Sequence, residues 1–83
     1  MMEPEEIEGL VRAELGDARV QVRGDGRHFQ ALVVTSAFEG VSRIRRHRMV
    51  LDPLRAHLDR DALHAISLRA LTPGEHESEQ QAG

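Results

Sequence analysis

A strand, a tight turn and a second strand follow one another in the first half of this chain, and this hairpin pattern limits the fold more than any other feature. Apolar and polar residues alternate over Ala18–Arg23, and Phe29–Thr35 is rich in β-branched and apolar residues. Between these runs, Asp25-Gly26 is a dipeptide favoured in two-residue β-turns. The segment therefore predicts an antiparallel pair of strands, against which the other elements must pack.

A helix is expected before the hairpin. Pro4 suits a first helical position, and Gly16 suits the residue that ends a helix. Apolar residues at helical spacing give this segment one buried face: Ile7, Leu10, Val11 and Leu15.

A second helix is predicted after the hairpin, with Ser42 as its N-cap. Its apolar residues recur at roughly helical spacing: Val41, Ile44, Leu51, Leu54 and Leu58. Pro53 lacks a backbone donor and biases Asp52 away from helical geometry, so we expect the helix to break there. Asp52 would then cap a short third helix that runs from Pro53 to about Leu58.

The last strand is predicted over Leu63–Leu71 and is closed by Thr72-Pro73-Gly74. Residues 1–73 would form a single domain, and the polar residues 74–83 would form a disordered tail. The order is helix, strand, strand, helix, helix, strand. The chain is therefore expected to be a small α/β protein, an α-β-β-α-α-β sandwich with a three-stranded mixed sheet and a right-handed crossover to a parallel last strand.

This topology gives two histidines a shared position. His28 directly precedes the second strand, and His64 lies at the start of the predicted last strand. Because parallel strands begin at the same edge of a sheet, we expect His28 and His64 to approach each other. Two neutral imidazoles can ligate iron, but a cluster needs four ligands, so another molecule would have to supply the rest.

The amino-acid composition limits the kinds of core and of functional site that this chain can form. The chain has 83 residues with no cysteine, no tryptophan and no tyrosine, and its two aromatic residues are phenylalanines. The core must therefore be built mainly from Val, Leu, Ile and Ala, and there is no aromatic platform on which bases could stack. Because the chain has no thiols, the ligands of any metal site in it would have to be histidine and carboxylate side chains. No catalytic triad or pair of carboxylates stands out, which predicts a protein that is not an enzyme.

Three short blocks of sequence together resemble the BolA family of small proteins. The central block is Phe-x-Gly-x-Ser-Arg-x-x-Arg-His-Arg-x-Val, from Phe38 to Val50. Gly-Asp-Gly-Arg-His-Phe lies upstream of it and Leu-His-Ala-Ile-Ser-Leu downstream, in the family's order, so the resemblance covers about residues 7–73. It implies the α/β sandwich of BolA proteins, which is similar to the class II KH fold.

The resemblance also implies a partner and a role. BolA proteins pair with monothiol glutaredoxins and share a [2Fe-2S] cluster, to which the glutaredoxin and glutathione contribute the sulfur ligands. The positions that match the BolA ligands here are His28 and His64. The implied function is therefore that of a non-enzymatic accessory protein for iron–sulfur cluster trafficking, iron homeostasis or stress response. A scaffold that binds glutaredoxin without metal is a third reading.

A basic segment supports an alternative function. It consists of Arg43, Arg45, Arg46, His47 and Arg48. Such runs most often form a solvated helix face, but guanidinium groups also suit phosphates, and BolA relatives have been regarded as transcription regulators. Against direct binding to DNA, the net charge is −3 and the Gly-x-x-Gly loop of true KH domains is missing between the helices.

The sequence also bears on localisation and on the other histidines. The amino terminus lacks a basic region followed by an apolar run, and no segment approaches the length of a membrane span, so a cytoplasmic protein is expected. His47 lies among arginines, where positive charge disfavours a metal cation. His57 and His76 have no motif around them and carry no predicted role.

Overall fold

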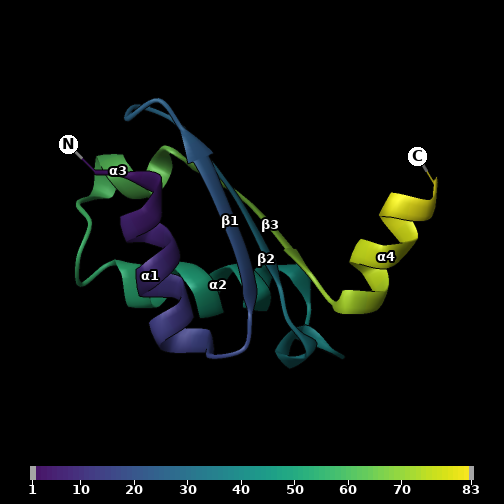
Figure 1. The fold of residues 1–83 in the computed structure, drawn as a ribbon. Coiled ribbons are helices and arrows are strands. Elements are labelled where there is room, and N and C mark those ends of the chain that lie inside the picture. Colours follow the sequence, from purple (N-terminus) through teal and green to yellow (C-terminus); the bar gives the residue numbers. More distant parts are fainter. Residues whose placement is uncertain (1, 83) are drawn as a thin grey trace.

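A mixed three-stranded sheet forms the centre of the computed structural model, which describes residues 2–82 (Figure 1). The strands are β1 (Arg19–Gly24), β2 (Phe29–Val34) and β3 (Ile66–Leu71). They lie in the order β1-β2-β3, with β1 antiparallel to β2 and β2 parallel to β3. The predicted hairpin and the predicted parallel pairing of the last strand are therefore confirmed.

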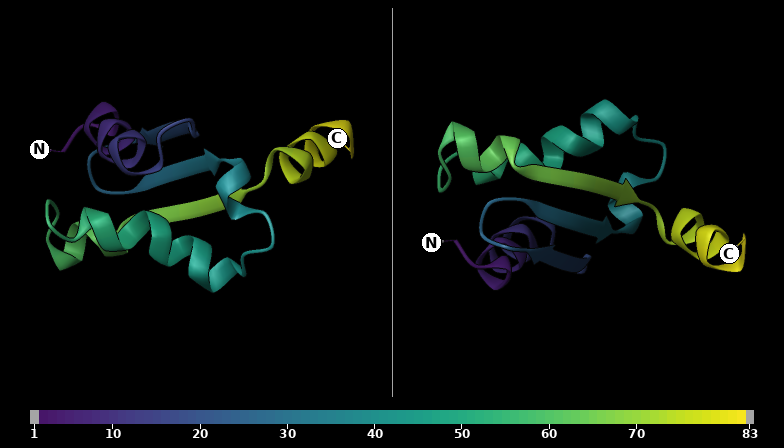
Figure 2. Two further views of the ribbon diagram at one scale, coloured as in Figure 1. Left: turned by 90° about the horizontal axis from the view of Figure 1, so that it is seen from below. Right: turned by 90° about the horizontal axis from the view of Figure 1, so that it is seen from above.

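The helices lie mainly on one side of this sheet. In chain order they are α1 (Pro4–Leu15), the short 3-10 helix η1 (Ser36–Phe38), α2 (Arg43–Leu54), α3 (Arg60–His64) and α4 (Pro73–Ala82). Helices α1, α2 and α3 lie to one side of the sheet, and α4 extends beyond its far end (Figures 1 and 2). None of the helices within residues 2–82 is long and apolar enough to cross a membrane.

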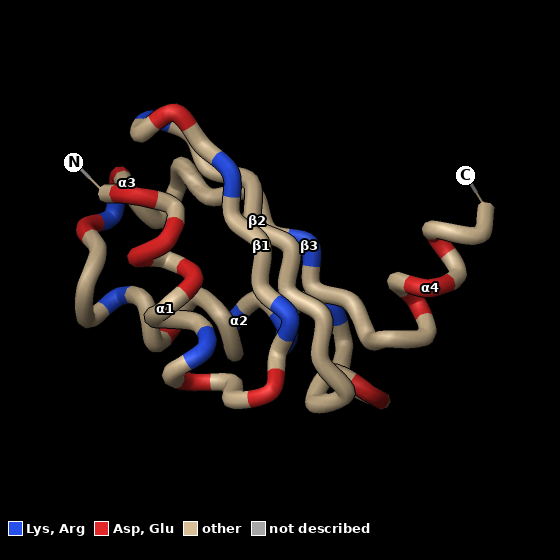
Figure 3. Tube along the Cα trace, in the orientation of Figure 1, with Lys and Arg blue, Asp and Glu red and all other residues tan. Residues whose placement is uncertain are grey.

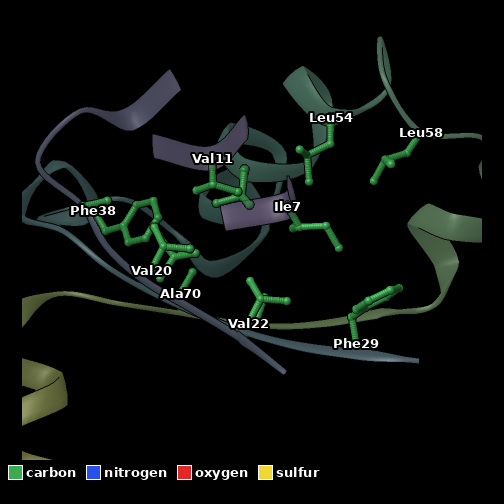
Figure 4. Packing of buried hydrophobic residues seen from close by; sticks show 13 residues of the cluster. Ile7, Val11, Val20, Val22, Phe29, Phe38, Leu54, Leu58 and Ala70 are labelled. Atoms are coloured by element: carbon green, nitrogen blue, oxygen red, sulfur yellow. The ribbon is translucent and has the colours of Figure 1, made fainter. Parts of the chain in front are cut away.

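The core between the sheet and the helices is aliphatic, as the composition predicts. Ile7 and Val11 of α1 and Leu54 of α2 are almost fully buried, and they pack against the inward-facing side chains of the strands (Figure 4). The two phenylalanines, Phe29 and Phe38, lie at opposite ends of this cluster. The alternation of buried and exposed residues along β1 follows from having only one face of the sheet against this core.

The hairpin loop is longer than the predicted two-residue turn. Strand β1 ends at Gly24 and β2 begins at Phe29, so four residues connect them. Gly26 has a φ of 92°, a left-handed conformation that favours glycine. The side chain of Asp25 accepts hydrogen bonds from backbone groups ahead of it, and these bonds favour the wider loop over a two-residue turn.

The predicted break at Asp52-Pro53 is wrong. Helix α2 starts after Ser42, whose Oγ accepts from the N–H of Arg45 as expected, and it continues through Pro53 to Leu54. Pro53 falls in the last turn, so its missing donor removes a hydrogen bond only where the helix is already ending. The N–H of Arg55 then closes the end by donating to the carbonyl oxygen of Asp52 at 3.1 Å.

The next helix starts later than predicted, and so does the last strand. In place of a helix over Pro53–Leu58, helix α3 begins at Arg60 and is capped by Asp59, whose Oδ1 accepts from the N–H of Ala62 at 2.8 Å. Helix α3 also takes up Leu63 and His64, which the apolar pattern assigned to the strand. Strand β3 therefore begins only at Ile66.

The polar tail is helical and not disordered as its composition predicts. Thr72 and Glu75 form a reciprocal cap at the start of α4. The N–H of Glu75 donates to the Oγ1 of Thr72 at 3.2 Å, and the N–H of Thr72 donates to a carboxylate oxygen of Glu75 at 2.8 Å. Pro73 adds a favourable first helical residue. The Thr-x-x-Glu spacing was therefore a helix signal that the polar composition obscured.

Candidate metal-ligand pair at the sheet end

His28 lies at the end of the hairpin loop, directly before β2, and is exposed. The Oδ1 of Asp25 accepts hydrogen bonds from the N–H of Arg27 at 2.8 Å and from the N–H of His28 at 3.0 Å. These bonds, with that from His28 the larger cause, lower the pKa of Asp25 below its ordinary value. Asp25 thus fixes the backbone that carries the His28 imidazole.

Gly24 is the second residue that shapes this loop. A Cβ atom at this position would lie 2.4 Å from Cδ1 of Phe29 and 2.5 Å from the carbonyl oxygen of His28. These separations are too short for any side chain, so the loop can close over Phe29 only with glycine here. The sequence pattern indicated Asp25 only as a turn residue, and no sequence signal showed that Asp25 and Gly24 shape the backbone that carries His28.

His64 is the last residue of α3 and is also exposed. It reaches the sheet through its neighbour Ala65, whose carbonyl oxygen accepts from the N–H of Phe29 at 2.9 Å. The residues after the two histidines, Phe29 and Ala65, are therefore bonded directly to each other. The structure places His28 and His64 at the same end of the sheet, as the topology predicts.

A groove lies beside His64. It has a volume of about 360 Å³ and lies between the end of α2, the following turn and α3. Its lining combines three leucines with two guanidinium groups and the imidazole: Leu51, Leu58, Leu63, Arg55, Arg60 and His64. Arg55 is partly engaged by Asp52, at 3.4 Å. The groove next to His64 is therefore lined by both apolar and cationic side chains.

The donor set determines what this end of the molecule can hold. No group of three or more His, Cys, Asp or Glu side chains within residues 2–82 is arranged to hold a metal ion. Two exposed imidazoles at one sheet end suit a shared site, in which a second molecule completes the coordination. The residues present therefore fit half of a ligand set, and they do not fit a metal centre closed by this chain alone.

The basic segment of α2 divides into two parts. Arg43, Arg45, His47 and Arg48 are exposed, and Arg46 is buried, with 7 % of its surface accessible. Ile44, assigned to the apolar stripe, is instead 68 % exposed. The face that packs on the sheet consists of Arg46, Val50 and Leu54, which are spaced four residues apart. The prediction that all five basic residues form one surface is therefore wrong for Arg46.

Arg46 connects α2, β3 and α4. Its Nε donates to the carbonyl oxygen of Val41 at 2.8 Å, and its Nη1 donates to that of Ala70 at 3.0 Å. Nη1 also lies 2.6 Å from a carboxylate oxygen of Glu75, and the guanidinium carbon lies 5.7 Å from the centre of the Phe38 ring. These contacts satisfy a charge that would otherwise be strongly destabilising when buried.

Glu75 is the acidic partner of this arginine. The hydrogen bond from Arg46 and then that from the backbone of Thr72 lower the pKa of Glu75 from 4.5 to about 2. Glu75 therefore both caps α4 and neutralises Arg46, which ties the C-terminal helix to the body of the domain.

Comparison with known sequences identifies the family. The sequence model of the BolA-like protein family matches residues 7–75, most of the chain. The acid stress protein IbaG of Escherichia coli (strain K12) is 38% identical over 74 residues, covering 89% of this chain and 88% of that protein. The chain therefore belongs to the BolA family.

Solved structures of BolA proteins have the same fold as this chain. A bolA protein homologue from Coxiella burnetii matches with a TM-score of 0.80 and 38% identity over 93% of this chain and 99% of that one. The BolA domain of SufE1 from Arabidopsis thaliana matches with a TM-score of 0.72 and 31% identity over 87% and 93%. The expected α/β fold with a mixed three-stranded sheet is thus the BolA fold.

Proposed function

We propose that this protein is a non-enzymatic accessory protein that binds a monothiol glutaredoxin and shares a [2Fe-2S] cluster with it, as cargo for cluster trafficking or iron homeostasis. One observation carries the proposal: the exposed His28 and His64 lie at one sheet end, on residues whose neighbours are hydrogen-bonded to each other. Membership of the BolA family supports the choice of partner, and similarity to an acid stress protein supports a stress-linked role.

In this proposal the chain supplies nitrogen ligands and holds them in place. His28 is positioned by the hydrogen bonds to Asp25, and His64 is positioned by the end of α3. Sulfur ligands come from the cysteine of the glutaredoxin and from glutathione, because this chain has no cysteine. The bound cluster would provide an iron–sulfur unit that can be passed to an acceptor protein.

The experiment is a titration of cluster-loaded monothiol glutaredoxin and glutathione with this protein under anaerobic conditions, followed by visible circular dichroism. The wild type should change the spectrum, and the His28→Ala/His64→Ala variant should not. His57→Ala/His76→Ala is the matched control, because it removes two histidines that carry no predicted role. Binding of the glutaredoxin without any spectral change would reject shared ligation and leave the scaffold reading.

The nucleic-acid alternative is weakened by one observation. Arg46, one of its proposed contacts, is buried and bonded within the domain, so the exposed basic surface of α2 is limited to Arg43, Arg45, His47 and Arg48. Direct DNA binding would show a steep loss of affinity with salt, and Arg43→Gln/Arg45→Gln/Arg48→Gln would reduce that salt dependence. An unchanged salt slope in this variant would exclude the alternative.

A further inference from the structure

Within residues 2–82, the outward-facing backbone groups are hydrogen-bonded to side chains along the β1 edge of the sheet but mostly not along the β3 edge. This difference suggests a docking site at β3. At the β1 edge, side chains of α1 bond the backbone groups that face outward. Nη2 of Arg12 donates to the carbonyl oxygen of Val20 at 3.0 Å, and Oε2 of Glu8 accepts from the N–H of Val22 at 3.1 Å. A further strand therefore cannot pair with β1 without breaking these bonds.

The β3 edge is open by comparison. The N–H groups of Phe29 and Thr35 donate to the carbonyl oxygens of Ala65 and Leu71, which fixes the two ends of the parallel ladder. Alternate residues of β3 therefore face β2, and the ones between them direct their N–H and C=O groups outward. Of these outward groups, the carbonyl of Ala70 accepts from Arg46. Those of Leu68 have no bond outside the ladder within the described residues.

Cationic side chains flank this open edge. A groove of about 190 Å³ runs along β3 and is lined by Leu68 and Arg69 of the strand, Arg43 and His47 of α2, and Glu79 of α4. Glu79 forms an ion pair with Arg69. Arg43 has no ion pair within residues 2–82. The groove therefore presents uncompensated positive charge beside unpaired strand edge.

An acidic segment of the chain already lies at one end of this groove. Helix α4 carries three glutamates and no basic residue apart from His76, and Figure 3 shows its acidic positions in contrast to the basic positions of β1 and β3. None of its residues is buried. Because exposed ion pairs contribute little, Glu79 can be displaced from Arg69 by a competing carboxylate.

From these observations we propose that the open edge of β3 binds an extended acidic segment of a partner protein, which adds as a fourth strand and places its carboxylates against Arg43 and Arg69 in competition with Glu79. Backbone pairing would supply affinity, and the cations would select acidic sequences. A second copy of this chain fits poorly, because it would bring the same positive charges together. A nucleic acid would satisfy the charges but not the strand pairing.

The test uses two-dimensional amide NMR of the full chain with a synthetic octapeptide of alternating valine and glutamate. We expect shifts at the amides of Leu68 and Ala70 and slower hydrogen exchange at Leu68. Two control peptides separate the contributions. One has lysine in place of glutamate, and the other is N-methylated at every residue, so that neither of its edges can donate to a strand. Neither control should bind measurably at the concentrations at which the acidic peptide binds.

Variants test the charge assignment. Glu79→Gln should tighten binding of the acidic peptide about two- to fivefold, because it removes the competing carboxylate. Arg43→Gln should weaken binding by a similar factor. Arg48→Gln is the matched control, since Arg48 lies on the same helix but does not line the groove, and it should leave the affinity unchanged.

Four results would overturn the proposal. Equal binding of the N-methylated peptide would show that strand pairing is not involved, and shifts confined to β1 would place the site elsewhere. Binding of a single-stranded DNA oligonucleotide at the same amides, with no binding of the acidic peptide, would assign the groove to nucleic acid. Concentration-dependent dimerisation that protects Leu68 without peptide would assign it to a second copy of the chain.

Discussion

At the scale of single residues, Arg46 is the charged group that the fold depends on most. It is buried where α2 and β3 meet the first turn of α4, and its guanidinium group bonds two backbone carbonyls and one carboxylate. A buried charge whose three nitrogens all donate hydrogen bonds holds neighbouring elements in a defined arrangement, because each lost partner leaves an unsatisfied polar group behind. Arg43, on the same helix, is exposed and forms no ion pair with residues 2–82, so it provides a natural comparison.

Arg46→Met should therefore destabilise the domain by about 2–4 kcal/mol, because it leaves the carbonyl oxygens of Val41 and Ala70 and the carboxylate of Glu75 without their donor. Arg43→Met makes the same chemical change at an exposed position and should alter stability by less than about 0.5 kcal/mol. Urea unfolding followed by far-ultraviolet circular dichroism measures both values. Equal, small effects of the two substitutions would contradict the structural role of Arg46.

Asp25 acts locally by holding the loop that carries His28. Asp25→Ala removes the acceptor for two backbone N–H groups, so amide exchange at Arg27 and His28 should become faster and the spectral response to cluster-loaded glutaredoxin should become weaker. Asp25→Asn keeps an acceptor oxygen and should retain most of both properties. If Asp25→Ala matches the wild type in exchange rates, the loop does not depend on this side chain.

At the scale of elements, the attachment of α4 should depend on pH through Glu75. Its pKa in the folded protein is about 2, below the ordinary value of 4.5, so ionised Glu75 contributes stability that is fully present above about pH 4.5. That contribution is lost as the pH falls through 4.5 toward 2, where the carboxylate becomes protonated in the folded state as well.

Glu75→Gln isolates this effect. Between pH 4.5 and 2 the wild type should lose more stability than the variant, and above pH 5 the wild type should be the more stable of the two. Thermal unfolding at a series of pH values gives the comparison, with Glu77→Gln as the control because Glu77 does not contact Arg46. Parallel pH profiles for wild type and Glu75→Gln would show that this carboxylate does not couple α4 to the domain.

The β1 edge offers another prediction at this scale. Glu8→Ala/Arg12→Ala removes the side chains that bond Val20 and Val22, so the edge becomes available for pairing and the variant should self-associate more readily. Glu5→Ala/Arg19→Ala removes the same charges without touching these backbone groups. Light scattering at increasing protein concentration measures the self-association of the two variants. Equal association would mean that the side chains of α1 do not prevent strand pairing at this edge.

At the scale of the whole molecule, the sequence predicts the architecture better than it predicts the element ends. The hairpin and the final strand are visible as local patterns, and the expected parallel pairing of the last strand correctly places His28 and His64 at one sheet end. Their role as ligands stays a prediction. Local rules failed at Pro53, because a proline near a helix end removes little.

The other two features that the sequence patterns did not predict, the burial of Arg46 and the helical α4, depend on contacts between distant parts of the chain. The burial of Arg46 depends on Glu75, which lies 29 residues further along the chain, so no local window shows that the two are partners. The helical α4 depends on the same contact in addition to its Thr72 cap, and composition alone therefore favoured disorder. Sequence patterns report local preference, and these two features are decided by pairing across the fold.

The central claim is that His28 and His64 ligate a cluster shared with a glutaredoxin. Its most direct test is pulsed electron paramagnetic resonance of the reduced complex, in which only the histidines of this chain carry ¹⁵N. Directly bound imidazoles should give ¹⁵N couplings in the wild type, and these couplings should be lost in His28→Ala/His64→Ala but not in His57→Ala/His76→Ala. A complex that holds the cluster yet shows no histidine ¹⁵N coupling would show that His28 and His64 are not its ligands.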